Sequence, residues 1–189
     1  MKKIIFLLTI IFLFSCNNSK KSNSSSSNEN VKEEYVDLLG FFKRKELNKE
    51  RHGFWFKENY EYYNLDHEIA NQIKPLIKDI EITVFMGTWC SDSRIHSPAF
   101  FKLMDYLKVR DRKLELIAMT IDKTTPDSLE KNQDIINIPT FIFKKDGKEI
   151  NRIVEFPIES IEKDIFKILS GSDYKNALGC LFENMYYDN

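Results

Sequence analysis

The chain has 189 residues, and its 28 Lys and Arg nearly balance its 29 Asp and Glu, which leaves a formal net charge of −1. One domain of about 100–200 residues with short extensions accounts for this length. Hydrophobic residues make up 42% of the chain, enough for a core, so wholesale disorder is excluded. The near-zero charge, without a stripe of Lys and Arg among aromatics, argues against a nucleic-acid partner.

The first fifteen residues predict an export signal. Lys2 and Lys3 precede an apolar run over residues 4–14, which is too short to cross a bilayer as a helix. The run ends in Leu-Phe-Ser-Cys at residues 13–16. This ending resembles a bacterial lipobox, in which cleavage before the cysteine leaves a lipid on the sulfur of Cys16. The alternative is an ordinary secretory signal that contains a cysteine.

Residues 17–30 comprise six Ser, five Asn, two Lys and one Glu. They offer no apolar side chain for burial, which predicts a flexible tether. A coil of this length reaches about 20 Å. We therefore expect a signal peptide over 1–15 and a lipid-anchored tether over 16–30. The mature protein is expected to be exported and membrane-anchored, facing the periplasm.

Residues 31–63 are predicted to form a helix followed by a strand. Residues 31–51 are charged with a group of apolar side chains, which favours a helix interrupted at Gly40. Residues 54–63 are rich in aromatics, which favours a strand whose rings serve packing rather than ligand binding. Asp66 is a candidate cap for a helix with a kink at Pro75. The apolar positions of that helix are Ile69, Ile73, Leu76, Ile77 and Ile80.

Strands alternate with helices in the main domain. Buried strands are predicted over 82–86 and 114–121, and a helix to about Val109 lies between them. The buried stripe of that helix is Ile95, Ala99, Leu103, Met104 and Leu107. The later elements are a polar helix or turn over 126–134, a hairpin of strands 140–143 and 149–154 around Asp146-Gly147, and a helix ending near Gly171.

This order of elements predicts a mixed sheet with helices on both faces. We divide the exported part into an N-terminal extension (31–52), a main domain (53–170) and a C-terminal tail (171–189). The buried side of the last helix comprises Ile161, Ile165, Phe166 and Leu169.

Cys90 follows Trp89 at the point where a predicted buried strand meets a helix. The free N–H groups and the positive end of a helix lower the pKa of a thiol placed there, and the thiolate is the reactive form. Cys90 is therefore predicted to be a nucleophile. Arg94, one helical turn further on, adds positive charge near the sulfur, and Asp92 opposes it.

Four features in matching register resemble the thioredoxin superfamily. Trp89-Cys90-x-x-Ser93 is similar to the family's Trp-Cys-x-x-Cys motif, with serine in place of the second cysteine. The other three are Pro98 in the active-site helix, Ile-Pro-Thr-Phe at residues 138–141, and Gly147 eight residues after Pro139. The resemblance covers residues 53–170 and implies a thioredoxin-like α/β fold, with a central mixed β-sheet flanked by helices and an N-terminal helical extension.

The resemblance also implies a substrate groove beside Cys90. In the family, the proline of this stretch is cis and its loop lies against the active-site cysteine. The backbone of Ile138 would then pair with an extended substrate segment. Trp89, Pro139 and Thr140 would line the groove.

Ser93 changes the predicted chemistry, because a hydroxyl cannot resolve a mixed disulfide as a second thiolate does. Ser93 can hydrogen-bond a Cys90 thiolate, which predicts monothiol disulfide exchange, isomerisation or client trapping. Cys180 is a candidate resolving thiol, although its apolar surroundings favour an inert, buried cysteine. The alternative function is a redox-inactive thioredoxin-fold module that binds a protein partner at the cell envelope.

No cofactor and no metal are expected, because the sequence has no paired Cys-x-x-Cys or His-x-x-x-His spacing. His52 and His67 are interpreted as surface residues. The expected partners are protein or small-molecule thiols and disulfides, and the membrane through a lipid on Cys16. The protein is expected to be a monomer.

Overall fold

The computed structural model describes residues 36–180. The predicted signal peptide, the tether with Cys16 and the start of the predicted helix at 31–51 lie outside the described residues, as does the end of the tail from residue 181. In the described part, no helix is long and apolar enough to span a membrane.

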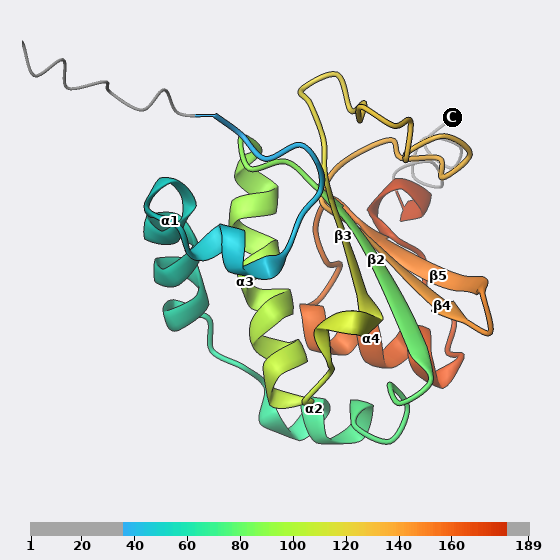
Figure 1. Ribbon diagram of the computed structural model, residues 1–189. Helices are drawn as coiled ribbons and strands as arrows, with labels where there is room; N and C mark the ends of the chain where they lie inside the picture. Colours follow the sequence, from blue (N-terminus) through green and yellow to red (C-terminus); the bar gives the residue numbers. More distant parts are fainter. Residues whose placement is uncertain (1–35, 181–189) are drawn as a thin grey trace, which may run out of the picture. The chain divides into compact units, whose positions relative to one another are not determined.

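A five-stranded mixed sheet lies at the centre of the fold (Figure 1). The strand order is β1-β3-β2-β4-β5, with β2 parallel to β3 and all other neighbours antiparallel. The sheet confirms the predicted mixed architecture, and its central strand β2 leads to Cys90. The strands are β1 Gly40–Phe41, β2 Ile80–Met86, β3 Leu114–Ala118, β4 Thr140–Lys145 and β5 Lys148–Val154.

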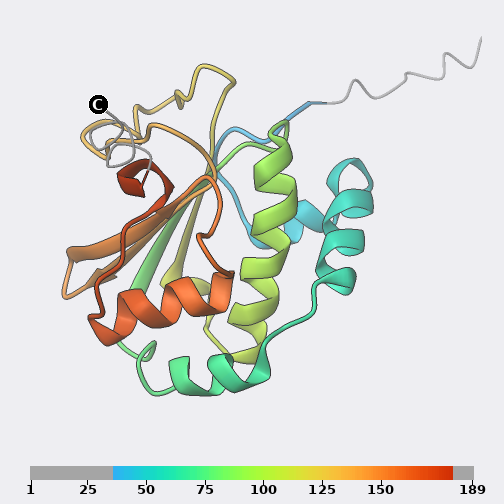
Figure 2. The same cartoon turned by 180° about the vertical axis from the view of Figure 1, so that it is seen from behind.

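The α-helices gather on one face of this sheet, as Figures 1 and 2 show from opposite sides. α1 packs on α3, and α2 packs on α4. The helical elements are η1 Arg44–Asn48, α1 Glu50–Tyr62, α2 His67–Ile73, α3 Ser91–Tyr106, η2 Asp111–Lys113 and α4 Ile161–Ser170. The prediction of helices on both faces is wrong for the described residues.

A loop over residues 119–139 covers the other face in place of a helix. The predicted helix or turn at 126–134 consists of turns. Ser128, Asn132 and Asp134 in this segment have positive φ, which an α-helix does not allow.

Alternation along the strands divides the apolar side chains between the two faces. Val84, Phe141 and Phe143 belong to the large core under the helices. Their neighbours Phe85 and Ile142 point to the other face, where they form a small cluster with Ile117, Met119 and Ile138. Trp89 and Cys90 pack against this small cluster.

Two predictions near the N-terminus are wrong. The predicted helix at 31–51 gives way to an extended segment, β1 and η1, because Gly40 has φ +72° and opens a strand instead of bending a helix. The predicted strand at 54–63 belongs to α1, where Trp55 and Phe56 bury their rings against the core. Within its described residues, 36–52, the extension is helical only in η1 and the first turn of α1.

Several local signals are confirmed. Asp66 caps α2 by accepting a hydrogen bond from the Ile69 N–H at 3.1 Å, although α2 ends at Ile73, before Pro75. Asp146 and Gly147 form a two-residue turn with positive φ at both positions, as a tight hairpin requires. α4 ends at Gly171 in the left-handed conformation. Ile95, placed in the buried stripe of α3, is instead 52% exposed.

Candidate active site

Cys90 is the N-cap residue of α3, directly after the loop that leaves β2. Its thiol is partly exposed, and its sulfur lies 3.4 Å from the carbonyl oxygen of Ile138, to which it donates. Its own backbone N–H donates to the Gly87 carbonyl at 3.0 Å, and its carbonyl accepts from the Arg94 N–H at 3.1 Å. The thiol therefore stands at the positive end of a sixteen-residue helix.

The loop that faces Cys90 contains the Ile138–Pro139 peptide bond, which is cis. The Thr140 hydroxyl donates to the Asn137 carbonyl at 2.6 Å, and the Glu155 N–H donates to the Pro139 carbonyl at 2.8 Å. Both bonds fix the loop to the start of β4 and the end of β5. The structure thus brings Ile138 next to Cys90.

Ser93 is fully buried one helical turn after Cys90. Its hydroxyl oxygen accepts a hydrogen bond from the Gly87 N–H at 3.1 Å. This bond joins the first turn of α3 to the loop that carries Cys90. The contacts described for Ser93 include none with the Cys90 sulfur, so its predicted bond to a thiolate stays a prediction.

Trp89 lies half-buried beside Cys90, and its indole N–H donates to the Met119 carbonyl at 2.8 Å. The ring rests directly on Gly87. A Cβ at position 87 would lie 2.7 Å from the indole and 3.0 Å from Ile138, closer than side-chain atoms pack. Gly87 is therefore required for this approach, a role that the sequence analysis missed.

Arg94 and Asp92 take different positions on α3. The Arg94 guanidinium donates to the Thr88 carbonyl at 2.6 Å and lies 5.8 Å from the centre of the Trp55 ring. Arg94 thus supports the Cys90 loop from the side of α1. Asp92 raises the pKa of His96, but burial of the imidazole is the larger effect and lowers that pKa overall.

Thr88, which the sequence analysis also missed, ties the N-terminal extension to the Cys90 loop. Its side chain is fully buried, accepts from the Leu38 N–H at 3.1 Å and donates to the Asp37 carboxylate at 2.7 Å. Asn59 makes a separate tie between α1 and α3, because its amide donates to the Trp55 carbonyl in α1 and to the Arg94 carbonyl in α3. The bonds of Thr88 to residues 37 and 38, and of Asn59 to Arg94, have no local sequence signal, since these partners lie dozens of residues apart.

The prediction that His52 is a surface residue is wrong. Its side chain is 2% exposed and its ring packs edge-on to Trp55. Burial lowers the pKa of His52, and the negative charge of Asp37 opposes that effect. His67, in contrast, is exposed as predicted and lies against Tyr106.

Cys180 is a free thiol in the helical residues 177–180. It is half-exposed, so the expectation of a buried cysteine is wrong, and its sulfur lies 3.7 Å from the Lys175 carbonyl. The tail that carries it rests on the sheet edge, where the Asn151 amide donates to the Tyr174 carbonyl. Its contacts in the described part do not include Cys90, so a resolving role stays a prediction. Residues 36–180 place no three His, Cys, Asp or Glu side chains together as a metal site.

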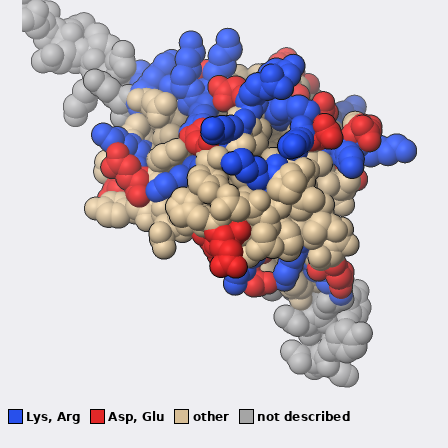
Figure 3. All heavy atoms as spheres, turned by 90° about the horizontal axis from the view of Figure 1, so that it is seen from below, with Lys and Arg blue, Asp and Glu red and all other residues tan. Residues whose placement is uncertain are grey.

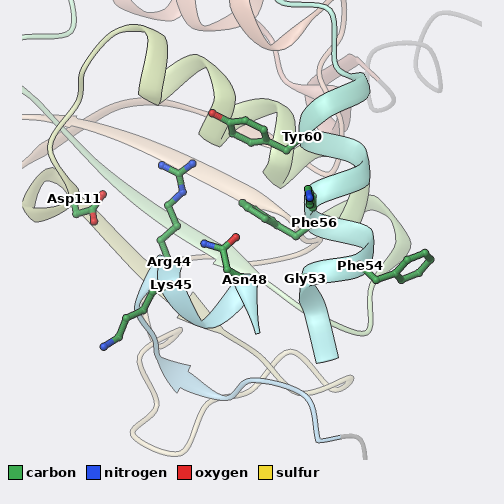
Figure 4. Close-up of a pocket in the computed structure, with 9 residues that line it drawn as sticks. Arg44, Lys45, Asn48, Gly53, Phe54, Phe56, Tyr60 and Asp111 are labelled. Carbon is green, nitrogen blue, oxygen red and sulfur yellow. The ribbon is translucent and has the colours of Figure 1, made fainter. Parts of the chain in front are cut away.

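A cavity of about 640 Å³ lies away from Cys90, between η1 and α1 (Figure 4). Arg44 reaches across it and binds Asp105 through two hydrogen bonds of 2.5 Å, which holds the pKa of Asp105 below its usual range. Phe54 points away from the other labelled residues and is 76% exposed. This cavity shares no residue with the Cys90 site.

Comparison with known proteins places this site in a family. A family model described as thioredoxin matches residues 41–166. Thioredoxin H2 of Arabidopsis thaliana is 30% identical over 102 residues, which are 54% of this chain and 68% of that protein. The thioredoxin of Listeria monocytogenes is 29% identical over 89 residues, 46% of this chain and 80% of that protein.

Among solved structures, Fasciola hepatica thioredoxin has 22% identity and a TM-score of 0.31, covering 46% of this chain and 78% of its own. The thioredoxin-like fold, with a cysteine at the start of α3, defines a class of thiol–disulfide proteins. The chain belongs to the thioredoxin family. Membership supports a redox role on protein thiols or disulfides in general terms.

Proposed function

We propose that this chain is an exported, membrane-anchored thioredoxin-like protein that performs monothiol disulfide exchange through Cys90. The supporting observation is a partly exposed Cys90 thiol that caps α3 and faces the Ile138 carbonyl, with a serine three residues later. The lipid on Cys16 is inferred from the sequence of residues 13–16.

The exchange has two balanced steps. The Cys90 thiolate attacks one sulfur of a client disulfide, a Cys90–client disulfide forms, and the other client sulfur leaves as a thiolate. A second thiolate, from the client or from a small thiol such as glutathione, then attacks the client sulfur and releases Cys90. When the second thiolate comes from the client, the client's disulfide is rearranged. When it comes from glutathione, the client keeps a glutathione mixed disulfide, and a second glutathione must remove it as glutathione disulfide before the client is reduced. In both cases Cys90 ends the cycle as a thiolate.

The surface around Cys90 suits a polypeptide client. Four apolar side chains are exposed here. They are Ile95 on α3, Ile121 in the loop after β3, Ile136 in the loop before β4, and Phe156 in the loop after β5. A pocket of about 350 Å³ opens beside Trp89, between residues 36–39 and 119–121. An extended apolar segment of a client would find contacts here next to the sulfur.

The test uses the full mature chain with Cys16→Ser, so that Cys90 and Cys180 are its only thiols. In a glutathione buffer, it should speed the reactivation of a ribonuclease with scrambled disulfides. Cys90→Ala should abolish this activity, and the matched Cys180→Ala should retain it. If Cys180→Ala abolishes it equally, the monothiol mechanism is wrong.

Ser93→Cys sharpens the same test, because it restores a thiol that can attack the mixed disulfide. The variant should gain net disulfide reduction in the presence of dithiothreitol and should release trapped client. The pocket beside Trp89 also fits the second candidate, a redox-inactive module that binds a partner. That candidate is favoured if client capture survives Cys90→Ala unchanged.

A further inference from the structure

The end of the sheet opposite to Cys90 carries an excess of positive charge. Strand pairing assembles it, because Ile80 pairs with Lys145 and Ile82 pairs with Leu114. Figure 3 shows Lys and Arg gathered in the upper part of the view, with some Asp and Glu among them. We call the cationic side chains at this end of the sheet the basic end. They are Lys74, Lys78, Lys108, Arg110, Arg112, Lys113, Lys144, Lys145 and Lys148.

These nine side chains make no ion pair with the described residues, and seven of them are exposed. The same segments, 74–81, 108–115 and 144–149, contain six Asp and Glu. Two of the six are engaged, since Glu149 binds Arg152 and Glu115 accepts from the Thr83 hydroxyl. Like charges left close together repel one another, and an external anionic surface would offset that repulsion.

The Cys90 end has the opposite sign. Its segments 36–39, 87–94, 119–139 and 155–158 contain seven Asp and Glu against three Lys and Arg. The two ends of β2 therefore carry opposite net charge, although the whole chain is almost neutral. A negatively charged plane would attract the basic end and repel the other end, so the charge pattern selects one orientation.

We infer that the basic end docks on a bilayer surface that exposes anionic lipid headgroups. Lys and Arg side chains near such a surface are attracted individually, and the attraction extends over about one screening length. Docking needs no lipid on Cys16 and no chemistry at Cys90, so it extends beyond the proposed exchange function. β2 rises about 20 Å from Ile80 to Met86, so a docked domain would present Cys90 to solution, away from the lipid.

The test is sedimentation of the full mature chain with phosphatidylcholine vesicles that contain or lack one-third phosphatidylglycerol. Cys16→Ser removes the lipid anchor. We expect binding only to the phosphatidylglycerol vesicles, and its loss in about 1 M salt, where the screening length is about 3 Å. Equal binding to both kinds of vesicle, or none to either, would overturn the inference, and neither outcome bears on disulfide exchange in solution.

Two variants with the same change in net charge separate the basic end from overall charge. The first combines Arg110→Gln, Arg112→Gln, Lys145→Gln and Lys148→Gln, and should weaken vesicle binding more than about tenfold. The control combines Lys57→Gln, Lys123→Gln, Lys131→Gln and Lys163→Gln and should retain binding. Equal losses in the two variants would contradict docking through the basic end.

Orientation is read from thiol protection with a bulky maleimide, in a Cys180→Ala background. A thiol introduced by Asp146→Cys, in the turn between β4 and β5, should react more slowly on phosphatidylglycerol vesicles than in solution. Cys90 should react at the same rate in both. Protection of Cys90 instead would reverse the orientation. Binding of inorganic polyphosphate without vesicle binding would assign the basic end to a soluble polyanion and overturn the lipid assignment.

Discussion

The two faces of the sheet are built on different principles. Helices cover one face and bury a large core, whereas the 119–139 loop covers the other and buries a cluster of five apolar residues. Cys90 packs against the small cluster. Most of the buried core thus lies on one face and the reactive thiol on the other, so substitutions should separate folding from reactivity.

The largest effect should come from Phe141→Ala, on the helix face. Phe141 is fully buried, and its ring centre lies 4.7 Å from that of Phe100. Removing the ring leaves a cavity in the main core and should lower the free energy of unfolding by about 3–5 kcal/mol. Urea unfolding measures this loss. The alkylation rate of Cys90 in the folded protein should not change, and a changed rate would show that the faces are coupled.

Ile142→Ala removes the next side chain along β4, which is equally buried but on the loop face. We expect a smaller loss of about 2 kcal/mol, because the loop can collapse into the space more easily than packed helices can. The alkylation rate of Cys90 should change, since the thiol packs on this cluster. Equal losses for Phe141→Ala and Ile142→Ala would remove the distinction between the faces.

Thr88→Val should destabilise the fold by about 1–2 kcal/mol, because the partly buried backbone N–H of Leu38 loses its acceptor. Asp37 loses the hydroxyl donor at the same time. Thermal unfolding measures the effect, and Thr88→Ser should restore most of it. The matched control is Thr124→Val at an exposed position; if it costs as much as Thr88→Val, the tie to the extension contributes nothing.

The smallest effect is a pH dependence from His52, whose pKa is lowered by burial. The unfolded chain then binds more protons than the folded chain just below the ordinary histidine pKa of about 6.5. The contribution of His52 to the free energy of unfolding is therefore fully present above that pH and decreases as the pH falls below it. His52→Gln should flatten this decrease in urea titrations, with His67→Gln as the matched control. Unchanged slopes in His52→Gln would contradict the assignment.

The sequence predicted elements whose signals are local. β2 is a short apolar run, the Asp146-Gly147 turn sets the hairpin, and Gly171 ends α4. The segment from 54 to 63 was predicted wrongly as a strand, because aromatic residues favour strands only where packing agrees. Here Phe56 packs against Phe101 of α3, and that contact selects a helix.

The site was likewise predictable only where its residues belong to local sequence motifs. The positions of Cys90 and of the loop over 138–140 follow from motifs, and the structure brings Cys90 and Ile138 together. Thr88 was not predictable, because its partners Asp37 and Leu38 are distant in sequence and lie in a segment expected to be helical. The loop at 119–139 was not predictable as the cover of a sheet face, since its composition fits a turn or a polar helix.

The tie between Thr88 and the extension decides where the domain can be cut. The family match begins at residue 41, yet the hydrogen bonds that hold the loop before Cys90 begin at Asp37. A fragment trimmed to the matched residues would leave the Thr88 hydroxyl without these partners. The shortest fragment that keeps these hydrogen bonds, for crystallography or screening, therefore starts ahead of Asp37. A fusion joined at residue 41 would lack the bonds that hold the loop before Cys90.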